Sequence, residues 1–119
     1  GAPLDREACR ASYQRAFEFF GCTRERPLIV HCNSWLLNPD HRCMLPESSR
    51  IIGFMNDFTP TFALPQERFT AAWRIFGKAS LLPMEQWPED NALRRGYLRL
   101  LREGRPVQNG QGLLLYRGE

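Results

Sequence analysis

Four consecutive side chains with reactive or hydrogen-bonding groups follow an apolar run at residues 28–30: His31, Cys32, Asn33 and Ser34. An imidazole can act as a general base near neutral pH, and a thiol can act as a nucleophile. Amide and hydroxyl groups at the end of a strand can hydrogen-bond peptide-like atoms. The residue types therefore predict His31 and Cys32 as candidate catalytic residues, and Asn33 and Ser34 as candidate ligand-binding residues.

A structural role competes with each of these functions. Adjacent strand residues point to opposite faces, so His31 and Cys32 cannot easily form a base and nucleophile pair if the strand continues through both. One of them would then face the core, as a buried thiol or a hydrogen-bonded histidine. Ser34 would cap the following turn, and Trp35 is more typical of a core anchor than of a stacking platform for a ligand.

Histidine and cysteine also raise the question of a metal site. Two close couples are present, His31 with Cys32 and His41 with Cys43. Their spacing matches no zinc-finger or zinc-ribbon pattern. The sequence therefore predicts no metal site.

Arginines recur at helical spacing near the end of the chain, at Arg95, Arg99 and Arg102, with Arg94 beside them. Such a face is usually hydrated, but it could also hold a diphosphate or an acidic partner. The net charge of +3 is modest, and Lys78 is the single lysine among 16 basic residues. Genomic base composition accounts for that preference, so we predict no nucleic-acid partner.

Helices must position these side chains, and signals for helix starts and ends recur along the sequence. A capping residue or a proline begins each expected helix, and a glycine or proline ends most of them. These signals predict helices at residues 5–21, 38–46, 48–58, 65–77 and 88–104. Asp5, Asn38 and Ser48 are the expected caps. The fourth helix should bury the apolar set Phe69, Ala72, Trp73 and Phe76.

Strand signals occur at residues 28–33, 59–64 and 113–116. Pro60 suits an edge strand. The apolar run at residues 28–30 suggests a strand that is covered on both faces and has a neighbour on each side. The neighbouring strand that this chain does not supply must come from the N-terminal half of a longer protein or from a second copy along the sheet edge. The sum is an α/β fold in a single domain over residues 1–119, with about three strands covered by four to five helices.

Composition sets further bounds on the 119 residues. With 43% hydrophobic residues the chain can bury a real core. The four cysteines are read as free thiols in a reducing cytoplasm. We find no apolar stretch long enough for a membrane span and no leader, so we predict no membrane partner. A chain that opens at Gly1 rather than methionine suggests a segment of a longer protein.

Several short segments of the sequence form one combination. The most specific segment is Cys-Asn-Ser-Trp-Leu-Leu at residues 32–37. The others are Pro3-Leu4-Asp5 before the first helix, Leu45-Pro46 followed by Ser48-Ser49-Arg50-Ile51, Phe76-Gly77, and a final helix before a glycine-flanked strand. Together these segments resemble the GNAT-like C-terminal domain of bacterial acyltransferase-domain proteins, and the resemblance covers nearly the whole chain.

This resemblance implies the C-terminal half of an N-acyltransferase-like fold, with the strand at residues 28–33 beside an acyl-coenzyme A cleft. In the superfamily, backbone amides of an Arg/Gln-x-x-Gly-x-Gly/Ala loop hold the pyrophosphate at the start of the first helix of this half. Residues 1–5 lack that loop, Pro3 lacks an amide donor, and Asp5 adds negative charge. The superfamily's tyrosine acid has no counterpart in residues 48–58.

The function implied is that of the C-terminal part of an acyl-CoA-dependent N-acyltransferase, which moves an acyl group to an amine of a small molecule or peptide. His31 would be the base, and Asn33 and Ser34 would hydrogen-bond the acyl carrier or the acceptor. Acyl-CoA would be bound by the full-length protein, and the isolated segment would be inactive. The alternative is a non-catalytic binding or assembly module that keeps the fold without the cofactor loop.

Overall fold

A three-stranded sheet carries the helices of this chain, and a computed structural model describes residues 5–118. The strands are β1 (Leu28–Ser34), β2 (Thr59–Pro65) and β3 (Gln108–Tyr116). The helices are α1 (Arg6–Phe19), α2 (His41–Met44), α3 (Arg50–Met55), α4 (Ala72–Phe76) and α5 (Ala92–Arg102). Short 3₁₀ turns lie at η1 (Trp35–Leu37), η2 (Gly77–Leu81) and η3 (Met84–Gln86). The predicted α/β class with three strands is confirmed.

The last strand in sequence, β3, lies between β1 and β2 and pairs antiparallel with both. The β1 ladder runs from Leu28 opposite Tyr116 to Ser34 opposite Gly110. The β2 ladder shifts its register between Pro60 and Phe62. Because proline has no amide to donate, it is tolerated at an edge or a bulge. The prediction of an edge strand around Pro60 is confirmed.

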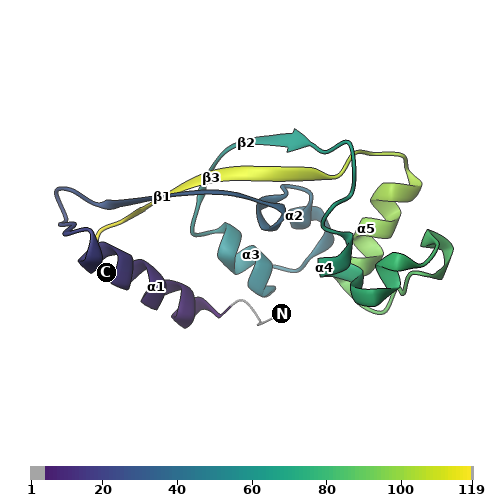
Figure 1. The fold of residues 1–119 in the computed structure, drawn as a ribbon, viewed down its shortest axis with the longest axis horizontal. Helices are drawn as coiled ribbons and strands as arrows, with labels where there is room; N and C mark the ends of the chain where they lie inside the picture. The colour runs from purple at the N-terminus through teal and green to yellow at the C-terminus, as the bar shows by residue number, and fades with distance from the viewer. Residues whose placement is uncertain (1–4, 119) are drawn as a thin grey trace.

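Strand β1 is also an edge strand within residues 5–118, and only one of its faces is covered. Leu28 is buried, whereas Ile29 is 65% exposed and its cross-strand partner Leu115 is 55% exposed. Figure 1 shows α1, α3 and α4 on the same side of the sheet, which leaves the other side open. The expectation of a strand covered on both faces is wrong for this chain by itself. An antiparallel sheet, unlike a parallel one, needs only one packed face.

The buried apolar residues form two clusters. The sheet cluster, between the sheet and α3, contains Leu37, Ile52, Met55 and Phe58. The helical cluster is built around α4 and α5 and contains Ile75, Phe76, Tyr97, Leu98, Leu100 and Val107. Trp35 packs against the helical cluster, as expected for a core anchor. Trp87, from the irregular segment before α5, also covers it, with its ring 4.7 Å from that of Phe76.

Glycine in β3 allows the turn η1 to lie directly on the sheet. A Cβ atom at Gly110 would stand 1.9 Å from the carbonyl oxygen of Leu37. Any larger residue would therefore push the turn away from the strand. This close approach directs the chain from the end of β1 into α2, and so sets where Asn38 and His41 lie.

Most helix ends match the capping signals. The Asp5 carboxylate accepts a hydrogen bond from the backbone N–H of Glu7 at 2.9 Å, so Asp5 caps α1 as predicted. At the end of α5, Gly104 has a φ of 72°, a conformation that favours glycine. The cap of α3 shifts by one residue, from Ser48 to Ser49. Helix α5, expected from residue 88, begins only at Ala92 with Asn91 as its cap.

The helix expected at residues 65–77 is much shorter in the structure, where α4 covers only Ala72–Phe76. Pro65 is still paired opposite Gln108 in the sheet, and the next backbone N–H, of Gln66, donates to the carbonyl of Val107 at 2.7 Å. The chain is thus held extended where the sequence suggested a helix start. As a consequence Trp73 is 60% exposed, and Ile75 takes the buried place expected for it.

Helix α2 also begins later than predicted, at His41 instead of near Pro39. Asn38 still acts in a cap-like way, since its side-chain oxygen accepts from the backbone N–H of Asp40 at 3.0 Å. The rest of the Asn38 amide points to Tyr97 of α5. A long-range hydrogen bond therefore competes with the local helix start and delays it.

Candidate functional site

The strand β1 extends through the whole predicted site and separates its members. His31 and Asn33 are exposed on the same face as Ile29, and Cys32 points to the opposite face. His31 Nε2 donates to Oε1 of Gln111 at 3.3 Å across the ladder. As expected for neighbours in a strand, His31 and Cys32 therefore cannot act on each other directly.

Cys32 and Ser34 each have a structural contact. Cys32 packs against the sheet cluster, and burial raises the pKa of its thiol, which disfavours the nucleophilic thiolate. The Ser34 hydroxyl accepts a hydrogen bond from the backbone N–H of Leu36 at 3.1 Å and caps η1. Of the four predicted site residues, His31 and Asn33 remain open to an incoming ligand.

The start of α1, where the resemblance would put a pyrophosphate, is already occupied by side chains of this chain. Asp5 takes the backbone N–H of Glu7, and Arg6 lies 2.6 Å from the carboxylate of Asp57 and also bonds the carbonyl of Gly53. Tyr13 donates to Asp57 at 3.5 Å, and burial, the largest cause, raises its pKa above the usual range. Residues 1–4, which complete the segment where the sequence lacks the pyrophosphate loop, lie outside the described residues.

A buried polar network links α2 to α5. His41, Asn38 and Tyr97 are all fully buried. Nε2 of His41 lies 2.6 Å from the Tyr97 hydroxyl, Nδ2 of Asn38 donates to the same hydroxyl at 3.2 Å, and Nδ1 of His41 lies 3.3 Å from the carbonyl oxygen of Leu36. Within residues 5–118, every buried side-chain nitrogen or oxygen has a hydrogen-bond partner.

The directions of these bonds follow from the groups involved. A carbonyl oxygen only accepts, so Nδ1 of His41 carries the proton and Nε2 of the neutral ring accepts from the Tyr97 hydroxyl. Burial lowers the pKa of His41 to about 4, although the Leu36 carbonyl and Asp40 act in the opposite direction. Burial also raises the pKa of Tyr97 to about 12. The network is therefore neutral at pH 7 and holds the two helices together.

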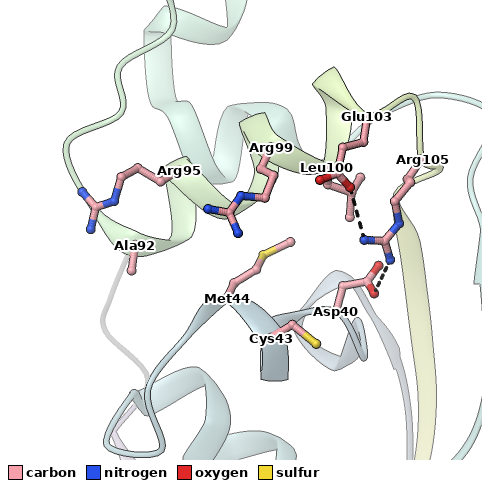
Figure 2. A pocket seen from close by; sticks show the side chains of 10 residues that line it. Asp40, Cys43, Met44, Ala92, Arg95, Arg99, Leu100, Glu103 and Arg105 are labelled. Atoms are coloured by element: carbon pink, nitrogen blue, oxygen red, sulfur yellow. Dashed lines mark hydrogen bonds and ion pairs between the residues drawn. The ribbon is translucent and has the colours of Figure 1, made fainter.

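A solvent-accessible cleft of about 420 Å³ lies between α2 and α5. Figure 2 shows Arg95 and Arg99 of α5 on one wall and Cys43 and Met44 of α2 on the other. At one end, Arg105 reaches Asp40 at 3.2 Å and Glu103 at 3.7 Å. We call this space the α2–α5 cleft.

The one sequence signal for the α2–α5 cleft was the helical spacing of the arginines in the last helix. That spacing is most often found on a hydrated helix face. What the sequence could not show is that α2, fifty residues earlier, lies against the same face. In the described part of the chain, no group of three or more histidine, cysteine or acidic side chains lies close enough together to hold a metal ion.

A comparison with protein families shows the class of protein to which this chain belongs. Residues 1–114 match the GNAT-like C-terminal domain, and the chain therefore belongs to that family. Among curated proteins, none matches the chain. Within residues 5–118, no helix combines the length and apolar character needed to cross a membrane.

Solved acyltransferase structures are similar over almost the whole chain. One is an acyltransferase in complex with decanoyl-CoA and teicoplanin, with a TM-score of 0.77 and 25% identity. Another is an acyltransferase mutant in complex with octanoyl-CoA, with a TM-score of 0.76 and the same identity. Each match covers 98% of this chain and 38% of that protein. The chain thus spans little more than a third of the length of these relatives.

Proposed function

We propose that this chain is the C-terminal part of an acyl-CoA-dependent N-acyltransferase, which transfers the acyl group to an amine. The observation that carries the proposal is the similarity of 98% of the chain, at a TM-score of 0.77, to an acyltransferase crystallised with decanoyl-CoA. Membership of the GNAT-like C-terminal domain family agrees with it. The bacterial and cytoplasmic setting, and acetyl-CoA as a donor, belong to the same proposal.

The role of general base in this reaction falls to His31. Its imidazole is exposed on the open face of the sheet, where a substrate amine can approach, and Gln111 orients it through Nε2. Asn33 lies on the same face and can hydrogen-bond the acyl carrier or the acceptor. Ser34 and Cys32 take part less directly, because Ser34 already caps η1 and Cys32 packs against the sheet cluster.

The N-terminal half of the same longer protein is the partner that we propose for the sheet. It would pack on the apolar residues of the open face, Ile29, Leu113 and Leu115, and pair with the free edge of β1. His31 and Asn33 would then line a cleft between the two halves that stays accessible to substrate. The chain is elongated, with a radius of gyration of 16.2 Å against the ~13.5 Å typical of a compact chain of this length. An exposed apolar sheet face with an unpaired edge needs such cover.

Hydrogen exchange tests this arrangement in the longest natural polypeptide that contains residues 1–119. Every second amide of β1 points away from β3 and has no partner in the three-stranded sheet. We expect these amides to exchange slowly in that polypeptide, since the missing strand would pair with them. Fast exchange at those positions would contradict the proposed partner.

Binding of acyl-CoA tests the function itself. Addition of acetyl-CoA or decanoyl-CoA should raise the melting temperature of the same polypeptide, because a ligand that binds the folded state stabilises it. His31→Ala should lower kcat by about 10²-fold or more while the thermal shift persists, as expected for loss of a base. Arg24→Ala, in the exposed loop before β1, is the matched control and should leave kcat unchanged.

A non-catalytic assembly module is the second candidate function. The observation in its favour is the start of α1, where Asp5 and Arg6 are engaged with Glu7 and Asp57 and leave little for a pyrophosphate. If neither acyl-CoA produces a thermal shift, the enzyme proposal fails and this module replaces it.

A further inference from the structure

We propose that the α2–α5 cleft is a binding site for an oxyanion, either a phosphate or a carboxylate, which Arg95 and Arg99 hold together. This site is independent of the proposed acyl transfer on β1.

The arginines on and after α5 fall into two groups. Arg94 lies 2.8 Å from Asp90, Arg102 lies 3.0 Å from Glu89, and Arg105 reaches Asp40 and Glu103. Arg95 and Arg99 have no carboxylate partner among residues 5–118. Arg95 donates only to the backbone carbonyl of Glu89, at 3.2 Å. Arg94, mainly through its hydrogen bond, lowers the pKa of the Asp90 carboxyl, and Arg95 is still close enough to add a smaller effect. The two arginines of α5 that form no ion pair within the described residues are therefore the two on the cleft wall.

The acidic residues at the cleft do not neutralise this pair. Asp40 accepts from both Arg105 and Gln108, at 3.2 and 3.3 Å, and Glu103 also faces Arg105. At this end of the cleft, Arg105 therefore pairs with the carboxylates of Asp40 and Glu103. The positive charge of Arg95 and Arg99 stays available to a ligand, and guanidinium groups suit phosphate and carboxylate because they can donate two parallel hydrogen bonds.

The cleft is held open by the packing of the two helices. A Cβ atom at Gly96 would lie 2.5 Å from Cγ of Met44, so glycine lets α2 and α5 approach closely there. Arg95 and Arg99 lie on either side of this contact along α5 and both line the cleft. Figure 2 shows the Arg99 side chain on the side of Met44 and the Arg95 side chain extending towards the start of the helix. The His41–Tyr97 contact locks the same two helices from the core side. The walls are therefore fixed before a ligand arrives.

Calorimetric titration of the longest natural polypeptide that contains residues 1–119 tests the site with two probes. The probe for phosphate is inorganic phosphate, and the probe for carboxylate is succinate. We expect at least one probe to bind. Its identity then tells which source of the oxyanion the site takes.

Two substitutions locate the binding. Arg95→Gln and Arg99→Gln should each weaken the affinity for the bound probe by about tenfold, the usual effect of one charge-assisted hydrogen bond. Arg102→Gln on the same helix, outside the cleft, is the matched control and should leave affinity within about twofold. These residues are at the surface, so the variants should fold.

Two results would overturn the proposal. One is that neither probe binds. The other is that a probe binds but Arg95→Gln and Arg99→Gln leave its affinity unchanged, which places it elsewhere. Neither result bears on the acyl-CoA thermal shift, so failure of this site and failure of the proposed acyltransferase are distinguishable.

Discussion

The two histidines of this chain lie ten positions apart and have opposite surroundings. His31 stands on the open face of the sheet, where its imidazole hydrogen-bonds Gln111. His41 is fully buried, and both of its ring nitrogens are bonded, to Tyr97 and to Leu36. The same side chain is thus open to solvent in one place and part of the packed core in the other. Residue type alone does not distinguish the two environments.

Removal of each imidazole should separate the two roles most clearly. His41→Ala leaves the Tyr97 O–H without its acceptor and the Leu36 carbonyl without the imidazole donor, and it opens a cavity, so we expect a loss of about 3–5 kcal/mol in unfolding free energy. His31→Ala should cost less than about 0.5 kcal/mol, as for other exposed positions. Urea unfolding measures both. Equal losses in the two variants would break the comparison.

The second largest effect that we expect is a loss of stability in acid through the buried His41. The pKa of His41 is about 4 in the folded protein against an ordinary value of 6.5, so the unfolded chain binds the proton more readily. Stability is therefore intact above pH 6.5 and falls as the pH drops towards 4, by up to about 3 kcal/mol.

The difference between wild type and His41→Gln isolates this contribution. The variant lacks the titrating imidazole, so its unfolding free energy should change less between pH 7 and pH 4 than that of the wild type. Parallel pH curves for the two proteins would show that other groups cause the acid sensitivity.

Removal of the Tyr97 hydroxyl measures how much the buried network contributes to stability. Tyr97→Phe keeps the ring stacked on Phe69, at 5.2 Å between centroids, but deprives Asn38 and His41 of their shared partner. We expect a loss of about 1–3 kcal/mol in unfolding free energy. Tyr116→Phe, which removes a half-buried hydroxyl bonded to Gln14 at the far end of the sheet, is a control with a smaller expected loss.

The smallest expected effect concerns the end of β1. Ser34→Ala removes the cap of η1 and should cost about 1 kcal/mol, whereas Asn33→Ala next to it should cost almost nothing. Thermal unfolding of the two variants provides the measurement. A larger loss for Asn33 would mean that its side chain has a structural role in β1.

The sequence correctly predicted that neighbouring site residues point to opposite faces of the strand, but it did not predict all of their contacts. That His31 and Cys32 point to different sides follows from strand geometry alone. The fixed contacts of Ser34 with Leu36 and of Cys32 with the sheet cluster agree with the structural alternatives for those residues. The buried partner of His41 could not be predicted, because Tyr97 lies 56 residues away and no local pattern joins them.

Local chemistry along the sequence was enough to predict the α/β class, the Asp5 cap, the edge strand around Pro60 and the end of α5 at Gly104. Each depends on the backbone preference of one residue and its near neighbours. The tertiary structure alone decided the strand order, the short α4, the His41–Tyr97 contact and the α2–α5 cleft. Each of these joins segments distant in sequence, and their pairing depends on which hydrogen bonds and apolar surfaces the whole chain can satisfy at once.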